Sequence, residues 1–211
     1  MFQGLPIYVF SKGQPDAIRT FAKQFKHLAC IDQFVGMKTL TKSWDVMSLA
    51  DVVLSRRSIR SYEHKKIPED IMKKILEAGR QAPSAGNRQP WRFVIVTDEQ
   101  IKEKLSHGRW NSFIRDSAFT LVGCRYVGDA YSRKWSTVDT TIALQNMVIA
   151  AWALGIGSCW IGDFKQDEVK SLLNIPDDWK VVALISFGYP AEQPGGKWKK
   201  PLEEIANYNR F

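Results

Sequence analysis

Three arginines stand within five residues of one another, at Arg56, Arg57 and Arg60, with serines between and beside them. The planar guanidinium group carries paired N–H donors that match phosphate oxygens, and a serine hydroxyl adds a neutral donor. Each such bond to a charged oxygen contributes about 1.5–3 kcal/mol. The cluster, which includes Ser58, therefore indicates a phosphate site, and a solvated basic turn is the alternative.

A second stretch, APSAGNRQPW at residues 82–91, combines two prolines, several very small side chains and two amides. Small side chains allow a backbone to approach a flat ligand closely. The amides of Asn87 and Gln89 offer both donors and acceptors, as the edge of a heterocycle does. The stretch indicates contact with a planar molecule, and a tight helix-to-strand turn marked by proline is the alternative.

A third stretch, GIGSCWIG at residues 155–162, places glycines around a short apolar run. Its small residues leave backbone N–H groups accessible beside an apolar surface. It is no dinucleotide-binding fingerprint, because the third glycine is missing and a helix precedes the run instead of following it. A buried, closely packed strand is the alternative.

The sequence contains no arrangement typical of catalysis by protein side chains. It has no nucleophile elbow with a Ser-His-Asp set and no GxxxxGK phosphate loop. The three cysteines and three histidines are too scattered for a disulfide framework or a metal site. We therefore predict no catalytic side chain and no metal, and expect a planar, phosphate-bearing cofactor to perform the chemistry.

Composition is that of a soluble globular domain, with 45% hydrophobic and 25% charged residues. The net charge of +8 is spread along the chain without a nucleic-acid-binding motif, so we expect no nucleic-acid partner. The most apolar run, residues 143–156, is too short to cross a bilayer of about 30 Å, so no membrane span is expected. No signal peptide is recognised, and a cytoplasmic location is predicted.

Helical and strand patterns alternate along the chain, which favours an α/β or α+β class. Ser48 is a helix cap for residues 49–54, and Pro68 begins a second helix. A helix over 140–154 is apolar nearly all round, which is typical of a helix buried on all sides, at a dimer interface if the chain pairs. Strands are expected at residues 92–96, 118–124, 155–162 and 180–187, and shorter helices after Asp98 and over 166–173.

Taken together and in this order, the motifs RRSIR at 56–60, APSAGNRQPWRF at 82–93 and GIGSCWIG at 155–162 resemble the nitroreductase family of flavoproteins. The resemblance covers about residues 48–205. It implies an α+β, three-layer α/β/α fold with a mixed, mainly antiparallel sheet, and a homodimer with two FMN molecules at its interface. Residues 48–211 would form the FMN-binding domain, and residues 1–47 an extension that packs on it or on the partner subunit.

The resemblance also implies a role for each matching position. Arg56, Arg57 and Ser58 would contact the phosphate and ribityl chain of FMN. Arg60 would lie near the N1–O2 edge of the flavin ring. A basic residue before a KPL-like stretch closes the phosphate site in the family, which corresponds to Lys199 or Lys197. The other implied contacts are Pro83, Ser84, Ala85 and Asn87 from the opposite subunit, Trp160, Ile161 and Gly162 near N5, and Gln145 on the long helix.

The implied activity is an FMN-dependent oxidoreductase that takes hydride from NADH or NADPH and reduces nitroaromatics, quinones or similar acceptors by a ping-pong scheme. Two alternatives stay open. One is a specialised enzyme of the same fold, such as a reductive dehalogenase, a ring dehydrogenase or a flavin-fragmenting enzyme, with lids at residues 107–116 or 128–136. The other is a flavin-binding redox sensor with little turnover.

Overall fold

The computed structural model describes residues 48–211, so the extension expected at residues 1–47 lies outside the described residues. A four-stranded sheet forms the centre, in the order β1-β2-β4-β3, and all three pairings are antiparallel. Its strands are β1 (Trp91–Val96), β2 (Phe119–Tyr126), β4 (Trp179–Gly188) and β3 (Gly157–Ile161). Within residues 48–211, the one parallel pairing is an isolated bridge between Ser58 and Ser158 at the β3 edge.

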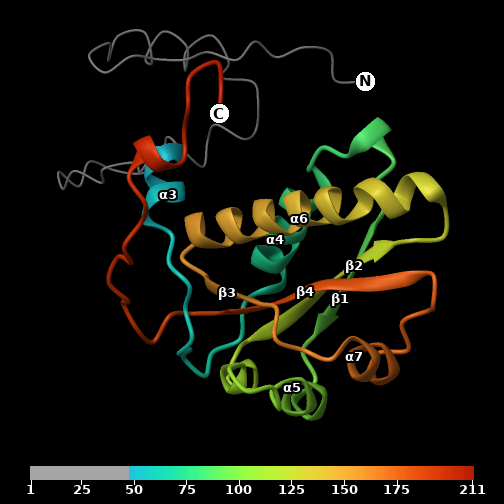
Figure 1. Cartoon of the computed structure of the whole chain (residues 1–211). Coiled ribbons are helices and arrows are strands. Elements are labelled where there is room, and N and C mark those ends of the chain that lie inside the picture. The colour runs from blue at the N-terminus through green and yellow to red at the C-terminus, as the bar shows by residue number, and fades with distance from the viewer. Residues whose placement is uncertain (1–47) are drawn as a thin grey trace, which may run out of the picture. The chain divides into compact units, whose positions relative to one another are not determined.

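Helices cover both faces of the sheet, which gives the three expected layers (Figure 1). On one face lie α4 (Glu69–Arg80) and α6 (Ala130–Ala153), and on the other α5 (Glu99–Leu105) and α7 (Gln166–Leu172). The α+β class and the three-layer fold are confirmed.

The two faces of the sheet carry separate hydrophobic cores because side chains alternate along each strand. On β4, Ile185 and Phe187 join the core under α4 and α6, whereas Val181 and Leu184 join the core under α5 and α7. Both sets are buried, which explains why the strands read as nearly continuous apolar runs in the sequence. The sheet thus brings the 56–60 and 155–162 stretches together at its β3 edge, whereas the 82–91 stretch leads into β1 at the opposite edge.

The helix expected over 140–154 begins ten residues earlier and is not buried on all sides. Asp129 caps it, its carboxylate accepting the backbone N–H of Ser132 at 2.8 Å. One face packs on the sheet, but Tyr131, Trp135 and Val138 are 38–49% exposed. Within the expected range, Gln145, Ala153 and Leu154 are exposed as well. Residue types alone do not distinguish a buried helix face from an uncovered one.

The candidate lid at residues 128–136 is corrected by the same helix, because residues 130–136 form its first turns. The other candidate, residues 107–116, is partly fixed in the core. Its Phe113 and Ile114 are buried in the short 3-10 helix η2 (Ser112–Ile114), whereas Trp110 is 71% exposed.

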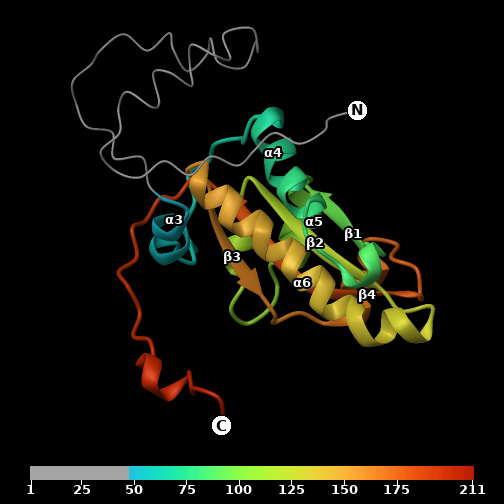
Figure 2. The same cartoon turned by 90° about the horizontal axis from the view of Figure 1, so that it is seen from above.

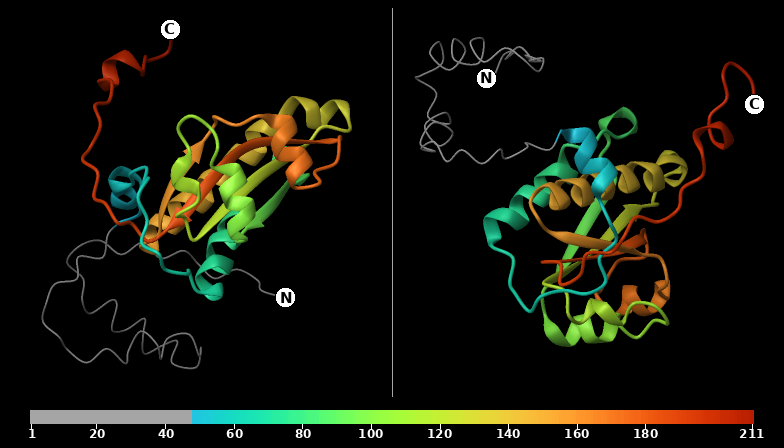
Figure 3. Two further views of the ribbon diagram at one scale, coloured as in Figure 1. Left: turned by 90° about the horizontal axis from the view of Figure 1, so that it is seen from below. Right: turned by 90° about the vertical axis from the view of Figure 1, so that its left-hand side faces the viewer.

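Two segments at one end of the domain expose apolar side chains. One is α3 (Leu49–Ser55), which begins at a capping box between Ser48 and Asp51. The other is the segment after residue 190, which contains η3 (Leu202–Glu204) and runs away from the sheet (Figures 2 and 3). Exposed large apolar groups on the two segments are Leu49, Val53, Leu54, Trp198, Leu202, Ile205, Tyr208 and Phe211. No helix within residues 48–211 is long and apolar enough to cross a membrane.

Candidate cofactor site

The arginine segment, residues 56–62, lies along the outer edge of β3. Ile59 is fully buried and donates its backbone N–H to Ser158 O at 3.0 Å, and Ser58 bridges Ser158. Further along, the segment pairs with the chain that leaves β4, where Ala191 N donates to Ser61 O at 3.0 Å. The arginine segment is therefore held in extended conformation, first by β3 and then by residues 189–191.

Glu192 also fixes this segment. One carboxylate oxygen accepts the backbone N–H groups of Arg60 at 2.6 Å and Ser61 at 3.1 Å. A carboxylate that binds two amides is a strong, charge-assisted anchor. It leaves the side chain of Arg60 available for other partners, because only the backbone of that residue is used.

The side chains of the arginine segment differ in what they already bind. Arg57 donates to the carbonyl oxygens of Leu54 and Arg56, both at 2.9 Å. Within residues 48–211, the guanidinium of Arg56 makes no hydrogen bond or ion pair with a side chain or backbone. The five N–H donors of the Arg56 guanidinium thus have no acceptor among the described residues. They are available for an anionic ligand such as a phosphate.

Residues 160–162 follow directly on the bridged part of β3, so the structure brings them close to the arginine segment. The indole N–H of Trp160 donates to Gln145 Oε1 on α6 at 3.2 Å. A Cβ placed on Gly162 would meet no atom within 4 Å, so packing of the chain itself does not require glycine there. The open space beside the Gly162 backbone fits a flat ligand, which supports the assignment of this stretch to the ring of the cofactor.

The lysines near the C-terminus are placed unequally. Gly196 stands beside Arg57, since a Cβ on it would lie 3.4 Å from the Arg57 guanidinium. The neighbouring Lys197 is close enough for its charge to act on the pKa of Cys159, as do Arg56 and Arg60. Both Lys197 and Lys199 are exposed, and neither makes a hydrogen bond or ion pair within the described part of the chain. The position of Gly196 beside Arg57 makes the adjacent Lys197 the nearer candidate along the chain.

The 83–87 turn stands apart from the rest of the predicted site within one chain. It contains η1 (Ala85–Asn87), and Ala85 N donates to Asp139 on α6 at 3.1 Å. At the other end of that helix, Trp152 donates to Ser55 beside the arginine segment at 3.0 Å. Thirteen residues of helix separate Asp139 from Trp152, or about 20 Å. The turn of one chain thus lies far from its own arginines, which fits the expectation that it serves the other subunit.

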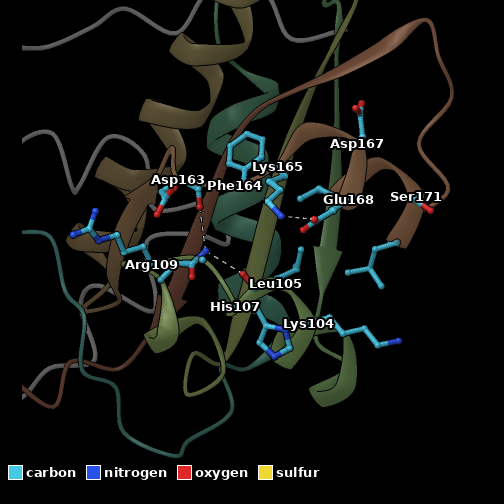
Figure 4. Close-up of a pocket in the computed structure, with 14 residues that line it drawn as sticks. Lys104, Leu105, His107, Arg109, Asp163, Phe164, Lys165, Asp167, Glu168 and Ser171 are labelled. Atoms are coloured by element: carbon cyan, nitrogen blue, oxygen red, sulfur yellow. Dashed lines mark hydrogen bonds and ion pairs between the residues drawn. The ribbon is translucent and has the colours of Figure 1, made fainter.

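Two pockets flank these elements. One of about 740 Å³ is lined by Ser55, Arg57, Trp152 and Glu192 and adjoins the arginine segment. The other, of about 880 Å³, lies between residues 104–111 and 163–172 (Figure 4). There Lys165 points to Glu168, their charged groups 2.7 Å apart. Among the predicted cofactor residues, Arg57 lines the first pocket and none lines the second, so the first pocket is the one that adjoins the candidate site.

Three residues that position the site were missed in the sequence: Asp139, Trp152 and Glu192. Each acts on a residue far away along the chain, 132 positions in the case of Glu192 and Arg60. No local pattern marks such a contact, because the partner is defined only once the sheet has formed. The only signal in the sequence is the acidic residue Glu192 itself, shortly after the last strand, which ends at Gly188.

Gly157 keeps the arginine segment close to β3, which predicts a steric effect of substitution. A Cβ on Gly157 would lie 2.7 Å from Cγ1 and 2.9 Å from Cβ of Ile59. We expect Gly157→Ala to lower the free energy of unfolding by about 1–3 kcal/mol, since the buried Ile59 must move. Urea unfolding measures this. Gly162→Ala is the control and should stay within about 0.5 kcal/mol, because its Cβ enters open space.

The two described cysteines are predicted to resist alkylation. Burial raises the pKa of Cys124 to about 11 and also raises the pKa of Cys159, against the lowering effect of the Arg60 and Arg56 charges. The thiolate is the reactive form, so both should remain unmodified by iodoacetamide at pH 8 in the native protein. Peptide mass spectrometry measures the labelling of each, with the urea-unfolded chain as the control. Rapid native labelling of Cys159 would contradict the burial of its thiol in the structure.

The sequence of this chain is similar to a known protein family and to several known proteins. The model of the Nitroreductase family matches residues 53–108 and 106–189. An Archaeoglobus fulgidus protein, named as a provisional NADH dehydrogenase/NAD(P)H nitroreductase, is 33% identical over 153 residues, which cover 67% of this chain and 85% of that protein. A Thermus thermophilus NADH dehydrogenase is 27% identical over 195 residues, with 76% of this chain and 95% of that protein covered.

Solved structures of similar fold are consistent with these sequence relationships. A nitroreductase family protein from Clostridium novyi superposes with a TM-score of 0.65 at 30% identity, covering 75% of this chain and 91% of that one. The NADPH:FMN oxidoreductase of Vibrio harveyi, in complex with NAD+, superposes with a TM-score of 0.74 at 24% identity, covering 77% of each chain.

Proposed function

This chain belongs to the nitroreductase family, and on that premise we propose that it is an FMN-dependent NAD(P)H oxidoreductase. The observation that carries the proposal is the hydrogen-bonded pairing of the arginine segment with β3. That pairing sets Arg56, Arg57 and Ser58 beside the strand that leads to Trp160–Gly162. A phosphate-bearing ligand and a flat ring therefore have adjacent sites on one edge of the sheet.

The chain's own residues have distinct roles in this proposal. Arg56, Arg57 and Ser58 hold the phosphate, with Lys197 as a further cation. Arg60, whose backbone Glu192 anchors, sets a fixed positive charge at the N1–O2 edge, where such charge is most effective in a site shielded from water. When bound, FMN supplies the redox chemistry, taking hydride from NADH or NADPH and passing electrons to a nitroaromatic, quinone or similar acceptor.

The backbone at Trp160, Ile161 and Gly162 lines the reactive middle of the ring. Gln145, held by the Trp160 indole, completes that wall from α6. These groups orient the ring and exclude water, and no side chain acts as an acid or base. One binding face then receives the nicotinamide and the acceptor in turn, which is the ping-pong order.

A homodimer forms part of the proposal, because the 83–87 turn lies about 20 Å along α6 from the arginine segment of its own chain. Pro83, Ser84, Ala85 and Asn87 would then meet the cofactor held by the partner subunit. Exposed apolar side chains on α3, on α6 and after residue 190 support pairing, since large uncovered apolar patches mark association sites. Light scattering should give about twice the chain mass of 24.1 kDa.

The test uses the purified full-length protein. We expect a yellow protein whose released flavin is FMN, bleached under anaerobic conditions by NADH or NADPH and recoloured by a quinone or nitroaromatic. A flavin that binds but is reduced by neither nicotinamide would favour the redox-sensor alternative. A chain that stays colourless in excess FMN would refute the proposal.

A further inference from the structure

The turn at residues 84–87 is attached to α6 by a buried carboxylate. Asp139 is 4% exposed, and its Oδ1 accepts the backbone N–H of Ala85 at 3.1 Å. Burying a carboxylate is unfavourable unless it is hydrogen-bonded. Within residues 48–211, the bond to Ala85 is the hydrogen bond that this side chain makes, so the turn is what satisfies the buried charge.

The backbone of the turn requires such support. Asn87 and Gln89 have φ angles of 53° and 50°, in the left-handed region that disfavours side chains, and Gly86 between Ala85 and Asn87 has φ 61°. Strained backbone persists only where the surroundings determine it. The bonds of Asn87 N and Gln89 N to Ser84 close the turn, both at 2.9 Å, but they do not attach it to the domain.

Two contacts from α6 provide that attachment. One is the Asp139 bond, and the other is the ring of Tyr131, which has the Arg88 guanidinium 4.1 Å from its centroid. Tyr131 is 38% exposed, whereas Asp139 is buried and its hydrogen bond to Ala85 is partly buried. A charge-assisted bond that is partly shielded from water is the stronger restraint.

We propose that Asp139 is a positioning residue for the cofactor site: it fixes the 84–87 turn on α6 in the conformation that meets the flavin of the partner subunit. This inference rests on the proposed function. It also refines one sequence-based role, since the N–H of Ala85 is engaged by Asp139. Ala85 thus offers the cofactor a small surface, and the donors of the turn come from Asn87.

The test combines two variants that remove the bond from opposite sides. Asp139→Ala removes the acceptor, and Ala85→Pro removes the donor while leaving α6 unchanged. Proline suits the first position of a helical turn. In both variants we expect amide hydrogen exchange at Asn87 and Gln89 to rise about tenfold or more, the equivalent of one charged hydrogen bond. This measurement uses the protein without added FMN.

Two further variants serve as controls. Asp139→Asn keeps a carbonyl oxygen at the same place and should restore most of the protection. Thr140→Val alters the neighbouring buried residue, whose hydroxyl has no partner within the described part of the chain, and should leave exchange in the turn unchanged. A second readout is the dissociation constant for FMN, expected to rise about tenfold in Asp139→Ala and at most about threefold in Asp139→Asn.

Unchanged exchange at Asn87 and Gln89 in both Asp139→Ala and Ala85→Pro would overturn the inference. If Asp139→Ala fails to fold, Ala85→Pro decides, because it leaves the helix and its core contacts intact. If the wild-type chain does not bind FMN, the proposed function fails. The exchange result then still decides whether Asp139 holds the turn.

Discussion

Replacing Arg56 by alanine is expected to weaken FMN binding by about ten- to a hundredfold, from the 1.5–3 kcal/mol of a charged hydrogen bond. The guanidinium has no partner within residues 48–211, so its removal should cost little folding stability and act mainly on the ligand. Titration of the apoprotein with FMN, followed by flavin fluorescence, gives the dissociation constant.

The matched control is Arg80→Ala on α4. Arg80 is an exposed arginine, whereas Arg56 is half-buried, and two of the Arg80 donors are satisfied by Glu77 at 2.6 and 2.7 Å. Loss of Arg80 should leave the dissociation constant for FMN unchanged. Wild-type affinity in Arg56→Ala would remove Arg56 from the phosphate site, and an equal loss in both variants would indicate a general effect of surface charge.

Phe187→Ala is expected to produce the largest loss of stability, about 3–5 kcal/mol in the free energy of unfolding. Its ring is fully buried and stacks on Phe119 with centroids 4.8 Å apart. A loss of that size is a large share of the roughly 5–15 kcal/mol that stabilises a typical domain. Urea unfolding followed by circular dichroism measures it.

Lys180→Ala provides the comparison on the same strand, because Lys180 is exposed and should change stability by no more than about 0.5 kcal/mol. Phe187 also pairs with Ser158 of β3, so the variant should hold FMN less well at temperatures near its lowered transition. A loss of stability below about 1 kcal/mol would show that the core closes around the gap.

Much of the fold could be predicted from the sequence, because its signals are local. The strand at Trp91–Val96, the Ser48 cap and the helix at Gln166–Leu172 follow from runs of apolar residues and from capping residues. The start of α6 was not predicted, although Asp129 is a typical N-cap residue whose carboxylate accepts the backbone N–H of Ser132. Aromatic residues at Tyr131 and Trp135 suggested a lid, since exposed aromatics are typical of substrate covers as well as of helix faces awaiting a partner.

The candidate site was predictable only in its parts. The arginine segment and the Trp160–Gly162 stretch were found by residue type, and the structure brings them together through the Ser58–Ser158 bridge. The sequence did not reveal the residues that anchor these parts, because each forms a hydrogen bond to a segment distant in sequence. These residues are Glu192, Trp152 and Asp139. A local sequence pattern also does not predict whether the 83–87 turn contacts the cofactor of its own chain or that of the partner subunit, because this depends on how the subunits assemble.

Three contacts made from α6 fix the spacing between the parts of the candidate site. Asp139 holds the turn, Gln145 meets the Trp160 indole and Trp152 meets Ser55, at fixed intervals of rise and rotation. One residue inserted between Asp139 and Trp152 would shift everything beyond it by about 1.5 Å and turn it by about 100°. Length variation in this chain should therefore be tolerated in its connections, while the stretch from Asp139 to Trp152 keeps a constant count.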